Sequence, residues 1–360
     1  MLTADRAQAL ANAAASFADF LGPLTADDLT ALVTRELGHP DILDDFQPHG
    51  SIKAKAVPPE ITLHIISGNT PHAGLQSLLR ALLIGSPKNC CKIPATGLPE
   101  IAAFKNKLPL ELANTITIES ELPDDWLAKA NAIIVYGTDE TIARFHRQTR
   151  PNQIFISHGH KISLGIIFDS TAPDVAKLAA RDASRFDQQG CLSPQFFYVA
   201  ETNNNTAQAF AESLATEMNR FNSDNPPPPR TPAEEADIAH LRSAYSFRAA
   251  SDPTAAIWSS ENSLDWTVLY ETDPNPATTP LPRTVFVKPL PDDLPHALAL
   301  IQPHLSTVGL APFTPEFQNK LTPLKSPRLC PIGQMQNPSP FWHPDGQPSL
   351  SPLIRWIDQG

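Results

Sequence analysis

The sequence predicts an α/β protein in which helices cover both faces of a parallel sheet. Short β-branched apolar runs alternate with segments of helical periodicity between residues 61 and 168, and this rhythm is typical of βαβ units. The chain has 360 residues, of which 41% are hydrophobic and 18% charged. These proportions are ordinary for a globular protein, and the length is sufficient for two domains.

The first half of the chain supplies most of the predicted sheet. Residues 1–37 are rich in Ala and Leu and predict helical structure, and leucines at helical spacing between 75 and 83 predict a helix that ends at Gly85. Further helices are expected at 99–106 and after Thr138, which can cap its helix. The strands expected here are 61–66, 89–93, 115–118, 132–135, 154–156 and 162–168.

The second half mixes strands, helices and rigid loops. Thr171-Ala172-Pro173-Asp174 predicts a capping box and a helix that leads the chain to residues 185–195. Many of the 38 prolines lie in this half and predict rigid loops. The other expected elements are helices at 207–220, 233–245 and near 295–302, with strands at 196–199, 266–270 and 284–287.

Composition and charge exclude several classes of function. The net charge of −11 argues against a broad basic face for nucleic acid. No apolar run is long enough to cross a bilayer. The first residues lack the basic start and apolar core of a secretory leader. The four cysteines include no CxxC pair, so neither a structural zinc site nor a disulfide framework is expected. A reducing cytoplasm is the expected compartment.

Cys191 is the candidate nucleophile. It follows Gly190 between a predicted helix and the predicted strand 196–199, within the run Arg185-Phe186-Asp187-Gln188-Gln189-Gly190-Cys191-Leu192-Ser193-Pro194-Gln195. A thiolate in such an accessible turn is suited to covalent catalysis. The alternative for any single cysteine is a small buried residue without chemistry.

The first predicted strand is followed by Ser67-Gly68-Asn69-Thr70-Pro71 and not by the GxGxxG motif of many dinucleotide-binding sheets. With four later segments it forms a set whose order and spacing resemble the aldehyde dehydrogenase superfamily, and within it the acyl-CoA reductases of the LuxC type. The four are Asn89-Cys90-Cys91-Lys92-Ile93-Pro94, Tyr136-Gly137-Thr138, Ser157-His158-Gly159-His160-Lys161 and the run from Phe186 to Pro194.

The resemblance assigns a role to each motif. It implies that Cys191 attacks the acyl group and that Asn69 helps to form the oxyanion hole, although Asn69 could instead cap the following helix. It places Lys92 at the cofactor ribose. It also places Gly137 and Thr138 at the cofactor phosphates, where an ordinary turn and helix cap is the alternative.

Ser157 and Gly159 lie where the superfamily has Glu-Leu-Gly-Gly-Lys, so they are expected beside the cofactor. Ser157 thereby replaces the glutamate that activates water in ordinary aldehyde dehydrogenases. A serine hydroxyl is a poor base near neutral pH, so an acyl-cysteine should hydrolyse slowly and survive for reduction. Two family features have no clear match: the second glycine of the phosphate turn and the later glutamate that holds the nicotinamide ribose.

The resemblance therefore implies NADPH-dependent reduction of a fatty acyl-CoA or acyl thioester to the aldehyde through an acyl-cysteine on Cys191. The alternatives are an acyl-phosphate reductase of the same superfamily, or a degenerate member that binds or transfers acyl groups without nicotinamide chemistry. A homo-oligomer or a multienzyme reductase complex is the implied assembly, with no metal ion.

The expected organisation has four parts. Residues 1–50 form an N-terminal helical segment, 51–157 a nucleotide-binding domain, 158–337 a catalytic domain with the nucleophilic cysteine, and 338–360 a tail that packs back on the core.

Overall fold

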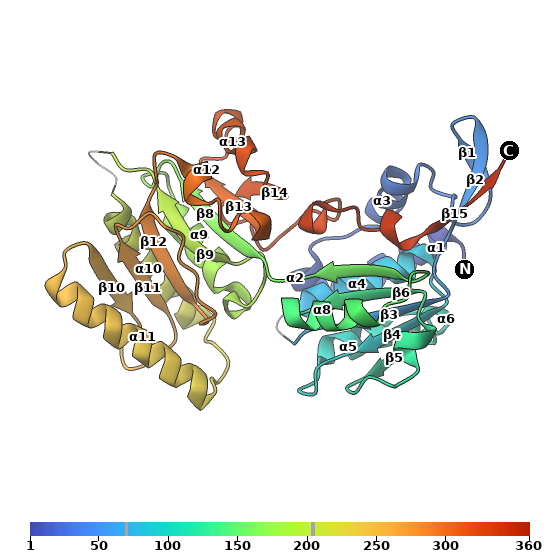
Figure 1. Ribbon diagram of the computed structural model, residues 1–360, viewed down its shortest axis with the longest axis horizontal. Helices are drawn as coiled ribbons and strands as arrows, with labels where there is room; N and C mark the ends of the chain where they lie inside the picture. Colours follow the sequence, from blue (N-terminus) through green and yellow to red (C-terminus); the bar gives the residue numbers. More distant parts are fainter. Residues whose placement is uncertain (69–70, 203–205) are drawn as a thin grey trace. The chain divides into compact units, whose positions relative to one another are not determined.

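The computed structural model describes residues 1–68, 71–202 and 206–360. The chain forms two compact units, one comprising Met1–His160 with Asn337–Gly360 and the other Lys161–Gln336 (Figure 1). Each unit contains a largely parallel sheet with helices packed on it, so the predicted fold class is confirmed. Asn69 lies outside the described residues.

The first unit is built on a parallel sheet with strand order β5-β4-β3-β6-β7. The chain starts in the middle at β3, moves outward through β4 and β5, and then returns to the other side of β3. This doubly wound order has its topological switch point between β3 and β6, beside the carboxyl ends of the strands. The strands are β3 (Ile61–Ile65), β4 (Lys88–Lys92), β5 (Ile116–Glu119), β6 (Ala132–Tyr136) and β7 (Ile154–His158).

Alternating side chains of these strands enter two separate cores, one on each face of the sheet. Ile134 packs with α1, α3, α4 and α5, whereas Ile133 and Val135 pack with α7 and α8. The helices of this unit are α1 (Thr3–Ala14), α2 (Ala18–Leu21), α3 (Ala26–Leu37), α4 (Pro71–Ile84), α5 (Pro99–Lys107), α6 (Leu110–Ala113), α7 (Trp126–Lys129) and α8 (Asp139–Gln148). The single helical segment expected at 1–37 is thus divided, and Thr25 starts α3 with a capping box.

The C-terminal segment belongs to the first unit. Strand β15 (Arg355–Gln359) pairs antiparallel with β2 (Ile52–Val57), which also pairs with β1 (Gln47–His49). Before β15, Leu350 and Leu353 enter the core that contains α1, α3 and α4. The carboxylate of Glu36 accepts hydrogen bonds from three successive backbone N–H groups of this segment, Ser349–Ser351.

The second unit contains a sheet with strand order β10-β11-β12-β9-β8-β13-β14, in which β10 alone among the described strands runs antiparallel to its neighbour. The strands are β8 (Ile162–Ile167), β9 (Pro194–Val199), β10 (Ala255–Ser259), β11 (Thr267–Glu271), β12 (Thr284–Pro289), β13 (Leu305–Ala311) and β14 (Arg328–Pro331). The helices are α9 (Val175–Ser184), α10 (Ala207–Asp224), α11 (Pro232–Ser251), α12 (Leu294–Ala297) and α13 (Pro315–Leu321).

The capping box expected at Thr171 is wrong. Helix α9 begins at Val175 after Asp174, which adopts a left-handed conformation and makes no side-chain cap. The Thr171 hydroxyl instead donates to Asp169 Oδ1 at 2.6 Å. A local turn therefore takes the hydroxyl that the sequence pattern assigned to the helix.

Candidate active site

The five candidate cofactor residues lie at one edge of the first unit's sheet. Lys92 ends β4, and Ser157 is the penultimate residue of β7. Gly137 and Thr138 follow β6, and Gly159 follows β7. Because the strands are parallel, all five lie at or near their carboxyl ends, which is the side on which such sheets bind ligands.

The turns after β6 and β7 contact each other closely. Thr138 caps α8 by accepting a hydrogen bond from the Thr141 N–H, as the sequence predicts. The Gly137 N–H donates to the His158 carbonyl at 3.3 Å, and the His160 N–H donates to Asp139 Oδ1 at 3.3 Å. A Cβ on Gly159 would lie 2.7 Å from the same Asp139 oxygen. A side chain at 159 would therefore have to displace the Asp139 carboxylate and the end of Ile142.

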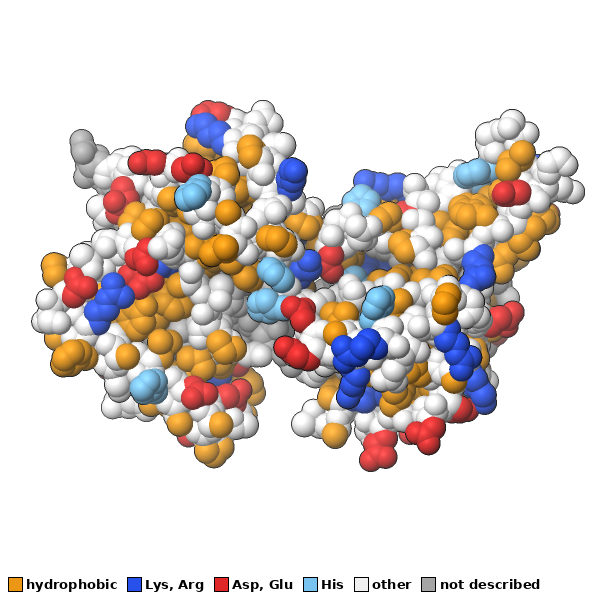
Figure 2. Space-filling view, in the orientation of Figure 1, with side chains coloured by type: hydrophobic (Ala, Val, Ile, Leu, Met, Phe, Trp, Pro, Cys, Tyr) orange, Lys and Arg blue, Asp and Glu red, His pale blue; other side chains and the backbone are white. Residues whose placement is uncertain are grey.

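Charge at this edge is mixed. Asp139 and Glu140 occupy the first turn of α8, and a hydrogen bond with Thr138 lowers the pKa of Glu140. The same helix carries the exposed Arg144 and Arg147. Figure 2 shows basic side chains gathered on this face of the first unit. This pattern complements the helix dipole without a ligand. The acidic first turn opposes a phosphate there, whereas half-buried Lys92 at the end of β4, two strands away from β6, provides a cation for one.

Cys191 occupies an exposed turn immediately before β9 in the second unit. The other three cysteines are buried, and burial raises the pKa of each of their thiols, that of Cys330 to about 12. A thiol with a raised pKa yields little thiolate near neutral pH. Accessibility therefore leaves Cys191 as the candidate nucleophile among the four.

A buried serine ties the backbone of this cysteine to the sheet. Ser163 Oγ, from β8, donates to the Cys191 carbonyl at 2.6 Å and accepts from the Thr307 N–H of β13 at 3.1 Å. Ser163 is fully buried. Its hydroxyl thus connects the backbone of the cysteine turn to the adjacent strands β8 and β13.

The loop that precedes Cys191 contains three consecutive residues with left-handed backbone conformations. The φ angles are 53° at Phe186, 54° at Asp187 and 61° at Gln188. Each costs a non-glycine residue roughly 1–2 kcal/mol, so surrounding contacts must hold the loop. The side chain of buried Gln188 does so by donating to the Pro194 and Thr284 carbonyls and accepting from the Thr284 N–H.

Asp187 lies between two buried arginines. Its carboxylate is 3.1 Å from Arg230 Nη1 and 2.9 Å from Arg283 Nε. The side chains of Arg230 and Arg283 are only 6% and 5% exposed. Two cations in such surroundings depend on this one carboxylate, so the ion pairs anchor the strained loop from its middle residue.

On the other side of Cys191, Gln336 joins the turn to α9. Its Nε2 donates to Ser193 Oγ at 2.7 Å and to the Asp182 carbonyl at 3.1 Å. The Asp182 carboxyl, which is 1% exposed, accepts from the Gly333 N–H at 2.5 Å. Burial raises the pKa of Asp182 to about 7 despite that hydrogen bond.

The sequence analysis proposed Cys191 but gave no indication of the side chains that hold its turn. Ser163, Gln188 and Gln336 are ordinary polar residues in a linear chain, and their partners are as many as 154 residues away. The one available signal was the run of polar residues Asp187-Gln188-Gln189 directly before Gly190-Cys191.

Among the helices that the structure describes, none has the length and apolar character needed to span a bilayer.

The geometry therefore describes an aldehyde-dehydrogenase-like chain with a doubly wound unit and a separate unit that carries an exposed cysteine. Solved structures agree on the fold. An NAD-dependent benzaldehyde dehydrogenase from Corynebacterium glutamicum has a TM-score of 0.64 at 14% identity, with 100% of this chain and 86% of that one covered. An aldehyde dehydrogenase from Brucella melitensis biovar abortus 2308 has a TM-score of 0.67 at 14% identity, with coverage of 100% and 85%.

The chain belongs to the acyl-CoA reductase (LuxC) family, whose model it matches over residues 3–356. A long-chain acyl-protein thioester reductase from Aliivibrio fischeri is 28% identical over 205 residues, covering 53% of this chain and 42% of that protein. A protein of the same name from Photobacterium phosphoreum is 26% identical over 233 residues, with coverage of 60% and 46%. Each match thus spans less than half of the relative's length.

Proposed function

We propose that the protein reduces a long-chain acyl thioester, carried by CoA or by a protein, to the aldehyde with NADPH. Two observations support this proposal: the chain is a member of the acyl-CoA reductase family, and its exposed cysteine lies on a strained, firmly anchored loop. The main support for the proposal is the environment of Cys191. The cysteine is exposed, and its turn is held in place by Ser163 and by the ion pairs of Asp187, so the thiol is accessible and preorganised for attack.

In the proposed reaction, the Cys191 thiolate attacks the thioester carbonyl, the carbon–sulfur bond to the carrier breaks, and the carrier thiolate leaves with a proton. We assign the backbone N–H of Cys191 to stabilising the oxyanion; Ser163 supports this turn by donating to the Cys191 carbonyl. One such donor contributes about 3 kcal/mol to the transition state. The family resemblance assigns the same role to Asn69.

We assign the dinucleotide to the carboxyl edge of the first sheet, with Lys92 at its ribose and Gly137, Thr138 and Gly159 at its phosphates. When bound, the cofactor supplies the hydride that converts the acyl-cysteine to the aldehyde. Ser157 is exposed at this edge and offers no carboxylate base. We therefore propose that water is not activated at Ser157 and that the acyl-cysteine persists until it is reduced.

The turnover test uses the full chain with hexadecanoyl-CoA and NADPH. We expect NADPH oxidation and hexadecanal formation in equal amounts, both abolished in Cys191→Ala. Cys330→Ala is the matched control, because Cys330 is a buried cysteine of the same unit and should keep its activity. Activity that persists in Cys191→Ala would contradict the proposal.

The position of Ser157 provides a second test. Ser157→Glu introduces the missing carboxylate at an exposed position and should increase hydrolysis of the acyl-enzyme to free fatty acid. Ser157→Gln has similar bulk without basicity and should not. Equal hydrolysis in the two variants would contradict the role assigned to this position.

A second candidate function is acyl transfer without nicotinamide chemistry. The acidic first turn of α8 favours it, since Asp139 and Glu140 oppose a phosphate at the helix start. Acylation of Cys191 without NADPH binding or oxidation would select this function. NADPH binding that weakens in Lys92→Gln would select the reductase.

The proposed setting is a reducing cytoplasm, because the mechanism needs Cys191 as a thiol. The proposed assembly is a homo-oligomer or a multienzyme reductase complex. Its support is the outer strand β15, on which Trp356 and Ile357 are 40% and 50% exposed. Sedimentation of the purified chain tests self-association, and a monomer at all concentrations would exclude the homo-oligomer.

A further inference from the structure

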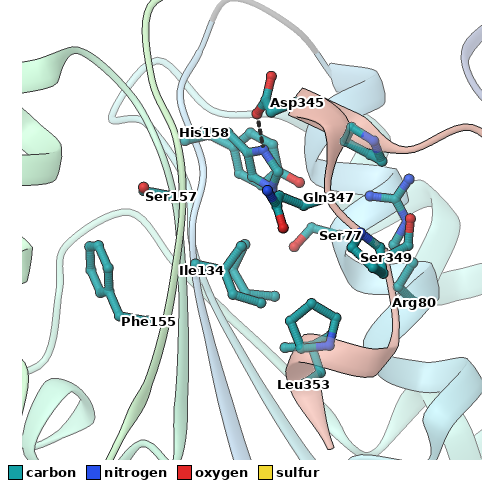
Figure 3. A pocket seen from close by; sticks show the side chains of 15 residues that line it. Ser77, Arg80, Ile134, Phe155, Ser157, His158, Asp345, Gln347, Ser349 and Leu353 are labelled. Atoms are coloured by element: carbon teal, nitrogen blue, oxygen red, sulfur yellow. Dashed lines mark hydrogen bonds and ion pairs between the residues drawn. The ribbon is translucent and has the colours of Figure 1, made fainter. Parts of the chain in front are cut away.

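A cavity of about 290 Å³ lies in the first unit beneath the C-terminal segment (Figure 3). Its walls come from α4, β6, β7 and residues 344–353. The volume is close to that of small-molecule sites in other proteins. None of the candidate cofactor residues except Ser157 lines it.

This cavity opens from the α4 face of the sheet. Ile134 and Leu353 on its wall belong to the core formed with α1, α3 and α4, whereas α8 packs on the opposite face. In Figure 3, Ile134, Ser77 and Arg80 lie on one side of the strands, and Phe155 and Ser157 project from the other. The cavity is therefore separate from the turn at the start of α8 that is assigned to the cofactor phosphates.

Arg80 is the unusual residue on the cavity wall. It projects from α4, is 9% exposed, and has no hydrogen bond or ion pair with any residue that the structure describes. Burial lowers the pKa of its guanidinium. A buried cation without a paired anion costs several kcal/mol, so the guanidinium is a strong and unused donor.

The two carboxylates whose charge reaches Arg80 are bonded elsewhere. Asp345 Oδ2 is 2.7 Å from His158 Nδ1, and His158 in turn stacks on Tyr136. Glu36 accepts the three backbone N–H groups of residues 349–351. Neither carboxylate pairs with Arg80, which leaves its N–H groups available to a ligand.

The rest of the wall combines apolar surface with one more unused polar group. Ser349 Oγ is buried and has no hydrogen-bond partner among the described residues. Ile134, Ile156 and Leu353 supply apolar surface around it. A ligand that fits must carry acceptor oxygens at one end and a short hydrocarbon body at the other.

We propose that this cavity binds a small organic oxyanion, a carboxylate or a phosphate ester, whose oxygens accept hydrogen bonds from Arg80 and whose apolar part contacts Ile134, Ile156 and Leu353. The proposal assigns a binding site beyond the acyl and cofactor sites. It does not depend on the proposed function, because Arg80 and the apolar residues that contact the ligand have no role in the proposed reaction.

Calorimetric titration of the full chain with butanoate, octanoate, inorganic phosphate and butyl phosphate tests the proposal, at equal ionic strength in chloride. Acids with the longer alkyl chain should bind more tightly, by about fourfold per buried methylene. Butanoate has one alkyl carbon fewer than butyl phosphate, so tighter binding of butanoate identifies a carboxylate ligand. Tighter binding of butyl phosphate, by more than the factor of about four expected for one methylene, identifies a phosphate ester. If none of the four binds, the proposal is overturned.

Three variants locate the binding. Arg80→Met keeps the bulk without the charge and should weaken binding at least tenfold. Gln347→Trp narrows the cavity from an exposed wall position and should also weaken it, which keeps the test valid if Arg80→Met fails to fold. Arg147→Gln, an exposed arginine on α8, should bind as the wild type does. Unchanged binding in Gln347→Trp and in any folded Arg80→Met protein would overturn the proposal.

This binding is measured without acyl thioester or NADPH. Cys191→Ala should therefore bind the anion with unchanged affinity. The two proposals can therefore fail independently. A protein that does not bind the anion can still become acylated at Cys191, and a protein that is not acylated can still bind the anion.

Discussion

In the first unit, the candidate cofactor residues lie within two residues of the strand ends that place them, whereas in the second unit the turn that carries Cys191 depends on side chains from distant segments. Gly137 and Thr138 need only β6 and the start of α8. The turn at Cys191 needs β8, β12, β13 and Gln336. The comparison indicates that the candidate phosphate turn is built locally, whereas the candidate nucleophile lies after a strained loop that long-range contacts hold.

The largest effect is expected from a substitution that removes the charge at the centre of the strained loop. Asp187→Ala leaves Arg230 and Arg283 buried without their carboxylate and should lower the free energy of unfolding by about 3–5 kcal/mol. Urea unfolding measures it. The control is Glu316→Ala in the same unit, which breaks an exposed pair with Lys320 and should cost about 0.5 kcal/mol or less. Equal losses in the two variants would show that the ion pairs do not anchor the loop.

Each unit contains a buried titratable group that makes the free energy of unfolding depend on pH, and the two groups act in opposite directions. In the second unit, the raised pKa of Asp182, about 7, means that the folded chain retains a proton which the unfolded chain loses near pH 4. Its contribution to stability therefore falls as the pH rises from about 4 to about 7. In the first unit, burial lowers the pKa of His64 to about 4. Its contribution is complete above about pH 6.5 and is lost as the pH falls toward 4.

Variants isolate these two contributions. Asp182→Asn should make unfolding free energy rise more steeply between about pH 4 and 7 than in the wild type, and His64→Asn should make it rise less steeply. In each variant, the change in unfolding free energy between about pH 4 and 7 should differ from that of the wild type by on the order of 3 kcal/mol. Denaturant titrations at several pH values measure the slopes. Slopes that change in the same direction would contradict the assignment.

A smaller effect is expected in the first unit at the contact between its two turns. Gly159→Ala places a Cβ against Asp139 and Ile142 and should cost about 1–3 kcal/mol of stability. It should also weaken NADPH binding roughly tenfold, because the turn moves away from α8. Fluorescence titration with NADPH measures the second effect. The half-buried Gly97 has open space around its Cβ position but a positive φ, so Gly97→Asn is the control for stability alone.

The smallest expected effect compares two helix caps. Thr138→Ala and Thr206→Ala each remove a hydroxyl that caps a helix, α8 in the first unit and α10 in the second. Each should cost about 1 kcal/mol of stability. Only Thr138→Ala should also weaken NADPH binding. Equal NADPH affinity in the two variants would remove Thr138 from the proposed cofactor site.

The comparison also explains what the sequence could predict. The strands and helices of the first sheet and the cap at Thr138 depend mainly on residues adjacent in the chain, so local patterns were sufficient. The capping box at Thr171 failed because a competing hydrogen bond to Asp169 has the same short range. Ser163, Gln188 and the contact of His158 with Asp345, 187 residues apart, require the folded chain before they have partners. No local pattern encodes them.

The most direct test of the central claim is the mass of the intact protein after incubation with hexadecanoyl-CoA in the absence of NADPH. The account predicts one added acyl group, located on Cys191 by peptide mass spectrometry, and none in Cys191→Ala. An unmodified protein, or an acyl group on one of the three buried cysteines, would contradict it.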